Sequence, residues 1–299
     1  MTRWLVTGAA GMLGRDLTAL LAERGEQVTG LGREDLDITD AEAVAATLDK
    51  HAPSVVVNCA AWTAVDDAET HEDDALRLNG AGPGNLAAAC ARLGAILVQP
   101  STDYVFDGQA DRPYREDDPT GPRSAYGRTK LAGERAVLET LPDSGYVVRT
   151  AWLYGEHGPS FVRTMLRLAR AGKQVTVVDD QTGQPTWTVD LAAQVVALVT
   201  AGAPAGVYHG TSSGQTTWFG LAQELFDLHA ASGGDGQGRE RVQPTTSAAY
   251  ASAATKPTAP RPTYSVLGHD AWAKAGIAPI GDWRDRLHRA YATMAAATA

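Results

Sequence analysis

The stretch "LVTGAAGMLGRDL", residues 5–17, decides the fold of this chain. An apolar run leads into three glycines spaced as TGxxGxxG, and an amphipathic stretch follows them. Glycine at these places permits a tight turn, lets the backbone approach a pyrophosphate and allows a helix to pack close on a strand. The order strand, turn, helix therefore favours a dinucleotide-binding unit over a glycine-rich turn without a ligand. The residues predicted to contact the cofactor here are Gly8, Gly11, Met12, Leu13 and Gly14.

Outward from this stretch, short β-branched runs alternate with longer amphipathic segments over about the first half of the chain. Runs such as "SVVVNCAA" (54–61) and "AILVQPSTD" (95–103) are nearly unbroken apolar strands, as expected in a parallel sheet with both faces covered. We predict an α/β fold: a doubly wound parallel sheet of the Rossmann type with a smaller, mixed α/β C-terminal substrate-binding domain. Residues 1–153 are assigned to the first domain, to which 179–210 return, and 154–178 and 211–299 to the second.

Composition narrows the class of protein. Of the 299 residues, 44% are hydrophobic and 20% charged, and the formal net charge is −9. Such a balance is typical of a globular enzyme and argues against nucleic-acid binding, which needs clustered Lys and Arg. The apolar runs are too short to cross a bilayer, and the N-terminal residues leave no room for a secretory signal, so a cytoplasmic location is expected. Cys59 and Cys90 stand in apolar stretches and are expected to be buried, reduced thiols.

The tip of the second predicted strand, "VTGLGRED" (28–35), bears on the choice of cofactor. An acidic residue normally ends this strand and accepts hydrogen bonds from the adenosine ribose of NAD. Arg33 stands there instead, and a guanidinium pairs well with a 2′-phosphate, which favours NADPH. Glu34 and Asp35 follow directly, and because a carboxylate there could bind the ribose of NADH, NADH remains an alternative cofactor.

Two further segments are predicted to line the cofactor. Asp37 and Ile38 fit an acidic-apolar pair against the adenine ring, although Asp37 also suits the start of the next helix. Small residues after the third strand let a ribose and diphosphate lie against the backbone; packing explains the alanines equally well, and the aromatic ring there also suits an ordinary loop position. The candidates after this strand are Ala60, Ala61, Trp62 and Thr63, with Val65 as a wall of a substrate pocket.

The fourth strand runs into Ser101, Thr102 and Asp103, which places polar groups at the carboxyl end of the sheet, where such folds bind ligands. Downstream, Tyr126 and Lys130 are four residues apart in "SAYGRTKLAGE" (124–134), so a helix presents both on one face. A solvated helix explains this spacing alone. With a nucleotide site and a strand-end hydroxyl nearby, a YxxxK catalytic pair is the better interpretation.

The chemistry of ketone reduction accounts for these residue types. Hydride transfer to a carbonyl carbon leaves negative charge on oxygen, which needs a proton at that moment. We expect Lys130 and the developing nicotinamide cation to lower the pKa of the Tyr126 phenol from its ordinary value near 10, and Lys130 to hold the ribose hydroxyls. Thr102 is expected to orient the carbonyl or adjust the phenol, or else to cap a turn. Asp103 is a candidate substrate contact.

Taken together, several stretches resemble the dTDP-4-dehydrorhamnose reductase family of extended short-chain dehydrogenases/reductases, nearly from end to end. These are "TGAAGMLG", "NCAAWTAVDDAE", "STDYVFDG", "YGRTKLAGE", "RTAWLYG", "DDQTGQPTW", "YHGTSSGQTTW" and "RPTYSVL". The resemblance implies NAD(P)H-dependent reduction of the C4 ketone of a dTDP-linked deoxysugar, foremost dTDP-4-dehydro-L-rhamnose. It implies that Tyr126 is the proton donor, that Lys130 assists, that Thr102 tunes the tyrosine and that Trp152 contacts the sugar.

The resemblance suggests further site residues, and it leaves two alternative functions possible. Arg261 is a candidate for the substrate pyrophosphate because its planar fork suits phosphate oxygens, although a surface arginine is as good an interpretation. Some family members bind Mg²⁺ at a dimer contact, where Asp16 and Asp190 are the comparable positions; no metal ligand is assigned, and a homodimer stays open. The alternatives are a reductase of another dTDP-keto-sugar in antibiotic biosynthesis, such as one forming dTDP-dihydrostreptose, and an NADP-binding regulatory subunit without catalysis.

Overall fold

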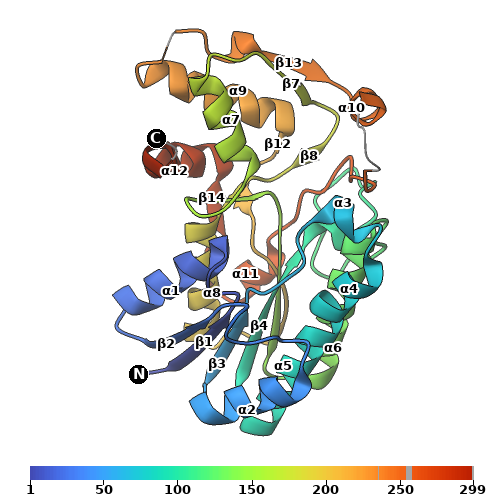
Figure 1. The fold of residues 1–299 in the computed structure, drawn as a ribbon, viewed down its shortest axis with the longest axis vertical. Coiled ribbons are helices and arrows are strands. Elements are labelled where there is room, and N and C mark those ends of the chain that lie inside the picture. The colour runs from blue at the N-terminus through green and yellow to red at the C-terminus, as the bar shows by residue number, and fades with distance from the viewer. Residues whose placement is uncertain (235, 254–257, 298–299) are drawn as a thin grey trace.

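The computed structural model describes residues 1–234, 236–253 and 258–297. Within these ranges the chain forms two lobes (Figure 1). The larger one, called the sheet lobe below, is built on six parallel strands in the order β10-β5-β4-β3-β1-β2. Their bounds are β1 Arg3–Thr7, β2 Gln27–Leu31, β3 Val55–Asn58, β4 Ile96–Thr102, β5 Gly145–Thr150 and β10 Gly206–His209.

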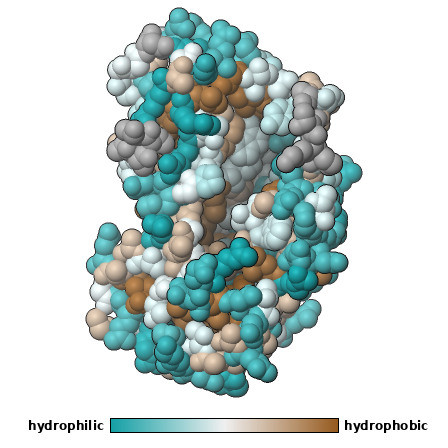
Figure 2. All heavy atoms as spheres, viewed as in Figure 1, coloured by the Kyte–Doolittle hydropathy of each residue, from teal (hydrophilic) through white to brown (hydrophobic). Residues whose placement is uncertain are grey.

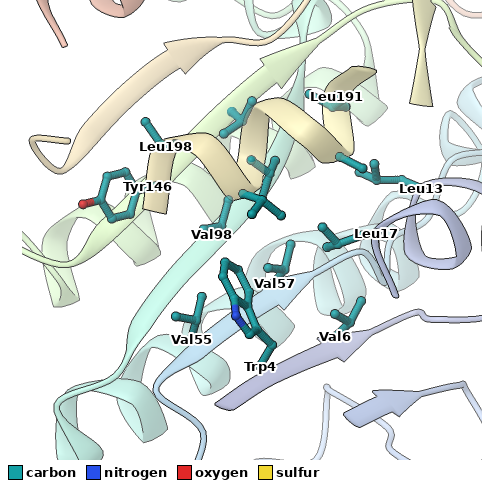
Figure 3. Packing of buried hydrophobic residues seen from close by; sticks show 14 of the residues in the cluster. Trp4, Val6, Leu13, Leu17, Val55, Val57, Val98, Tyr146, Leu191 and Leu198 are labelled. Atoms are coloured by element: carbon teal, nitrogen blue, oxygen red, sulfur yellow. The ribbon is translucent and has the colours of Figure 1, made fainter. Parts of the chain in front are cut away.

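Helices cover both faces of this sheet because successive residues of each strand point to opposite sides. In β1, Trp4 and Val6 face one side and Leu5 the other. The first side packs on α1 (Met12–Glu23) and α8 (Thr188–Thr200), as Figure 3 shows. The second side packs on α2 (Ala41–His51), α5 (Gly82–Leu93) and α6 (Ala125–Thr140). The predicted doubly wound fold is confirmed.

The connections on the carboxyl side of the sheet carry short helical turns. The order of the strands reverses between β1 and β3, so the loops after these two strands flank the crevice in which such folds bind ligands. The short elements of the sheet lobe are α3 Val65–Ala68, α4 Glu72–Leu76, a π-helical turn η1 Arg77–Ala81, and a 3₁₀ turn η2 Asp103–Val105.

The smaller lobe packs three helices against a two-stranded parallel pair. Its helices are α7 Phe161–Arg170, α9 Trp218–Ala231 and α12 Trp283–Ala297, and the pair is β7 Val175–Val178 with β13 Val242–Thr245. A separate apolar core joins these elements. Short strand pairs connect the lobes: β6 Leu153–Tyr154 with β9 Thr186–Trp187, β8 Thr182–Gly183 with β12 Thr216–Thr217, and β11 Ser212–Ser213 with β14 Ile280–Asp282.

The polar segment before the last helix holds a 3₁₀ turn η3 (Arg239–Arg241), β13 and α10 (Ser247–Ala253), and then returns to the sheet lobe. There Trp272 of α11 (Asp270–Lys274) joins the core under α8 and donates its indole N–H to the His209 carbonyl at 2.8 Å. The sequence did not indicate this return. Among the helices of the described ranges, none combines the length and apolarity that crossing a bilayer requires.

Candidate active site

The glycine loop after β1 is tightly folded and leads into α1. Gly8 has φ +62°, and a Cβ atom there would lie 2.5 Å from the Ala60 amide nitrogen. A Cβ at Gly14 would meet the Gly8 carbonyl oxygen. Gly11 occupies the N-cap of α1 with no side-chain hydrogen bond to the free amides. A bare, tightly folded loop at an uncapped helix N-terminus fits the pyrophosphate of a dinucleotide.

The loop after β2 presents both charges that bear on cofactor choice. Arg33 is exposed, and Asp35 folds back so that its carboxylate accepts a 2.7 Å hydrogen bond from the Gly32 amide. The Asp37 carboxylate accepts from the amide and hydroxyl of Thr39, which holds its pKa below the ordinary value. The helix N-cap is Asp40, three residues after Asp37.

The expected adenine contact at Ile38 lies in a packed setting. Its side chain is buried in the core over α5, where a Cβ at Gly82 would come within 2.6 Å of the Ile38 Cδ1 atom. The Asn85 side chain donates to the Ile38 carbonyl at 3.0 Å. An adenine role for Ile38 therefore stays a prediction, and its side chain contributes to the core.

The segment after β3 is held by buried amides. Asn79 accepts from the Trp62 amide at 2.8 Å and donates to the Trp62 carbonyl at 3.1 Å, so both backbone groups of this loop residue are fixed. Ala60 and Ala61 are half-buried beside it, and Thr63 is exposed. The Trp62 ring stacks on His71 at 6.1 Å. The loop thus presents backbone and small side chains next to the glycine loop.

Helix α6 carries the candidate catalytic pair and approaches the sheet closely. The Ser124 hydroxyl caps it by accepting from the Gly127 amide at 3.1 Å. A Cβ at Gly127 would meet the Tyr104 carbonyl oxygen, and one at Gly133 the Asn79 carbonyl oxygen. Sequence reasoning missed both glycines, although they stand within the motif. Their lack of a side chain lets α6 bring Tyr126 and Lys130 to the end of β4.

Lys130 is 5% exposed and donates a 2.7 Å hydrogen bond from Nζ to the Pro100 carbonyl oxygen. Burial lowers the pKa of this ammonium to about 8, an effect that the charge of Glu134 partly offsets. Glu134 is itself buried and paired with Arg149 at 2.8 Å. The lysine is thus a buried cation whose charge depends on pH near neutrality.

Burial raises the pKa of the Tyr126 phenol to about 12, and the neighbouring Asp103 charge adds to this rise. A hydrogen bond with the Thr102 side chain acts in the opposite direction. The expectation that Lys130 lowers this pKa was wrong for the chain by itself, because the lysine is directed at Pro100 and desolvation of the phenol dominates. The phenol is therefore fully protonated at neutral pH.

Asp103 lies beside this pair with 2% of its surface exposed. The Thr102 hydroxyl donates to its Oδ1 atom at 3.0 Å and accepts from the Tyr104 amide at 3.2 Å. Burial raises the pKa of Asp103 to about 6, against the hydrogen bonds from Ser265 and Thr102. Thr102 therefore acts both as a turn cap and as the link between the phenol and a buried carboxyl.

The substrate candidates lie around this centre. Thr102 pairs in register with Thr150 of β5, so Trp152, two residues later, projects from the neighbouring strand end. Val65 opens α3 and is half-buried. Arg261 is not a free surface arginine: it pairs with Asp66 at 2.9 Å, and its guanidinium carbon lies 6.0 Å from the centre of the Tyr104 ring. The Tyr104 ring in turn meets that of Tyr126 edge-on at 5.7 Å.

The chain also carries side chains to which the sequence analysis assigned no role. Trp218, the first residue of α9, stacks on Trp152 with ring centroids 3.6 Å apart. A buried chain of amides runs beneath the cofactor loops: Asn58 donates to Gln99 at 2.8 Å, and Gln99 donates to the Pro100 carbonyl at 2.9 Å. Only the positions of Trp218 after "YHGTSSGQTT" and of Gln99 inside an apolar strand could have suggested these roles.

The aspartates considered for a metal do not converge. Asp16 accepts from the Thr188 hydroxyl and lies 3.9 Å from a ring nitrogen of His157, whereas Asp190 faces Arg286 at 3.6 Å. In the part of the chain that the structure describes, no group of three or more His, Cys, Asp or Glu residues could hold a metal ion. We therefore draw no step through Mg²⁺.

Comparison with known proteins identifies the family of this chain. A family model described as the RmlD substrate binding domain matches residues 2–296. A dTDP-4-dehydrorhamnose reductase of Streptomyces griseus is 56% identical over 98% of this chain and 94% of its own length. The chain belongs to the dTDP-4-dehydrorhamnose reductase family. The resemblance drawn from the motifs is thereby confirmed.

Two further members of the family bear on the activity. A protein of Streptomyces niveus named dTDP-4-keto-6-deoxy-D-glucose reductase is 55% identical over 97% of this chain and 96% of its own length. A crystal structure of dTDP-4-dehydrorhamnose reductase from Bacillus anthracis, in complex with NADP, superposes with a TM-score of 0.89. It is 33% identical and the match covers 97% of this chain and 99% of that one. The family thus includes enzymes named for different dTDP-keto-sugars.

Proposed function

We propose that this protein is an NADPH-dependent reductase of the C4 ketone of a dTDP-linked 4-keto-6-deoxysugar. The first candidate reaction converts dTDP-4-dehydro-L-rhamnose to dTDP-L-rhamnose. The observation that carries the proposal is that Tyr126, Thr102 and Lys130 lie at the carboxyl end of β4, beside a tightly folded glycine loop at the uncapped N-terminus of α1. The names of the relatives at 56% and 55% identity support this class of substrate.

In the proposed reaction, each residue of the site has a separate chemical role. Bound NADPH supplies the hydride for the carbonyl carbon. Tyr126, protonated at neutral pH, gives its proton to the carbonyl oxygen, and this transfer is downhill because a sugar alkoxide is a stronger base than a phenolate. The Thr102 hydroxyl, which donates to Asp103 before the reaction, would stabilise the resulting phenolate by turning its one proton to it; this hydrogen bond lowers the pKa of Tyr126. The buried Lys130 charge favours negative charge at the same strand end.

Recognition of the substrate would come from the residues around this centre. We place the hexose between Tyr126 and Trp152, with Val65 and Asp103 as further walls, and the diphosphate at Arg261. Release of Arg261 from Asp66, or a shared contact, is then part of binding. The division into a dinucleotide-binding and a substrate-binding domain, a cytoplasmic location, a homodimer and Mg²⁺ at a dimer contact all remain proposals.

The test is turnover of NADPH with a panel of dTDP-4-keto-6-deoxysugars, followed by its near-ultraviolet absorbance, with the products assigned by NMR. We expect dTDP-L-rhamnose from dTDP-4-dehydro-L-rhamnose. A product from another panel member alone would identify a related reductase, the alternative that the Streptomyces niveus relative favours. NADPH binding without turnover of any member would contradict the proposal and indicate a regulatory subunit.

A further inference from the structure

Trp152 is held in a backbone conformation that a tryptophan rarely adopts. Its φ is +47°, and Ala52 is the other non-glycine residue with positive φ in the described ranges. Such a conformation is strained and persists only where the surroundings impose it, most often at functional sites. Trp152 also remains half-buried, although large aromatic side chains nearby are fully buried. The strain therefore serves the placement of this indole.

The partner that imposes the placement comes from the other lobe. Trp218 stacks on Trp152 with ring centroids 3.6 Å apart and planes at 12°, and Phe161 of α7 supports Trp218 from 4.7 Å. At the edge of the Trp152 indole, Gly183 leaves room: a Cβ there would lie 2.7 Å from the ring atom Cε2. Trp218 thus fixes the plane of the Trp152 indole, and the absence of a side chain at Gly183 leaves space for the edge of that ring.

A chain of hydrogen bonds extends this arrangement to α10. The Trp218 indole N–H donates to the Gln181 side chain at 3.2 Å, and Gln181 donates to the Ser247 hydroxyl at 2.8 Å. The Ser247 hydroxyl donates to Asp180 at 2.5 Å. Through Trp218, this chain of hydrogen bonds links the Trp152 ring to helix α10.

We propose that Trp218 is a positioning residue for the hexose of the substrate, which acts by holding the Trp152 indole in the plane that the sugar ring meets, with Gln181 fixing Trp218 in turn. This inference rests on the proposed function. Trp152 lies two residues beyond the register partner of Thr102, and the molecule is hollowed between the lobes (Figure 2). An aromatic plane at that place can contact the apolar face of a pyranose, and its tilt selects which sugar fits.

The decisive experiment compares Trp218→Leu with Phe226→Leu. Phe226 lies on the same helix and in the same core but is not in the tryptophan stack, so its variant controls for loss of core packing. Binding of dTDP-L-rhamnose and of dTDP alone is measured by calorimetry for each. We expect Trp218→Leu to weaken dTDP-L-rhamnose up to about tenfold, within what an aromatic pair contributes, and to leave dTDP and NADPH unchanged.

Spectroscopy supplies a second readout. Two indoles stacked this closely give an exciton couplet in circular dichroism, which Trp218→Leu should abolish and Phe226→Leu should keep. Gln181→Leu should keep the couplet in weakened form and lower the affinity for dTDP-L-rhamnose by less than Trp218→Leu. Equal affinity of wild type and Trp218→Leu for dTDP-L-rhamnose would overturn the inference, whatever the effect on stability. Absence of keto-sugar turnover in the wild type would instead overturn the proposed function.

Discussion

The Nζ atom of Lys130 lies 2.7 Å from the Pro100 carbonyl oxygen, two residues before Thr102 in the same strand. Gln99 donates to that oxygen as well and accepts from Asn58, so the acceptor of the ammonium belongs to a buried network. The lysine is thereby fixed by the sheet, independently of the phenol on its own helix. In the proposed mechanism the lysine contributes its charge, without a direct bond to the phenol.

The pH dependence of catalysis should report this charge. Burial lowers the pKa of Lys130 to about 8, so the ammonium loses its proton in a range where an ordinary lysine keeps it. We expect kcat/KM to fall as pH rises through about 8, since that ratio follows ionisations of the free enzyme. Lys130→Met should lower kcat/KM strongly and lack this alkaline limb. The melting temperature of Lys130→Met should not lie below that of the wild type, because the methionine buries no charge.

A wild-type profile that stays flat between about pH 7 and pH 9 would show that the charge of Lys130 is not required. Stability depends on pH in the opposite direction from kcat/KM. Because the folded-state pKa lies below the unfolded one, the unfolded chain binds the extra proton between these two values. The contribution of Lys130 to stability therefore rises with pH above about 8, and this rise should be missing in Lys130→Met.

Removal of the phenolic hydroxyl tests the proton donor. Tyr126→Phe keeps the ring contacts with Tyr104 but has no proton to give, so kcat should fall by roughly 10²–10⁴-fold. NADPH affinity, measured by fluorescence titration, should stay nearly unchanged. Tyr104→Phe is the matched control, since it removes a hydroxyl from the adjacent ring and should retain most of the activity. Loss of NADPH binding in Tyr126→Phe would mean that the tyrosine is structural.

The glycine loop can be tested with two substitutions of the same kind. Gly8 and Gly25 both have positive φ, +62° and +72°, so alanine strains the backbone at either place. At Gly8 the new Cβ also meets the Ala60 amide at 2.5 Å, whereas at Gly25 nothing lies within 4 Å. We expect Gly25→Ala to cost about 1 kcal/mol of stability and to bind NADPH normally. Gly8→Ala should abolish NADPH binding; normal binding would contradict the assigned close approach.

The parts of the structure that sequence predicts well are those that local pattern determines. The TGxxGxxG stretch, residues 5–17, specifies the end of a strand, a tight turn and the start of a helix, and each conformational demand falls on a residue type that meets it. The YxxxK spacing likewise places Tyr126 and Lys130 on one helix face. Here the local pattern determines the geometry by itself, so the motif sufficed to place these residues.

The missed features join residues that are far apart along the chain. Trp152 meets Trp218 across the two lobes, and Arg261 meets Asp66 because its segment returns to the sheet lobe; no periodicity encodes either partner. The same reason explains the wrong expectation for Tyr126. Its pKa depends on how completely packing excludes water from the phenol, and the four-residue spacing to Lys130 carries no information on that packing.

The cofactor preference rests on the exposed Arg33 at the tip of β2, where the Asp35 carboxylate is engaged by the Gly32 amide. If the Arg33 guanidinium binds the 2′-phosphate, Arg33→Ala should weaken NADPH by about tenfold to a hundredfold, the range for a hydrogen bond to a charged group, and leave NADH unaltered. Arg24→Ala, at the far end of α1, is the matched control and should change neither affinity. Because the contact between Arg33 and the 2′-phosphate would be exposed to solvent, the difference in affinity between NADPH and NADH should shrink as salt is added. Equal affinity of the unaltered protein for the two cofactors would show that Arg33 does not discriminate between them.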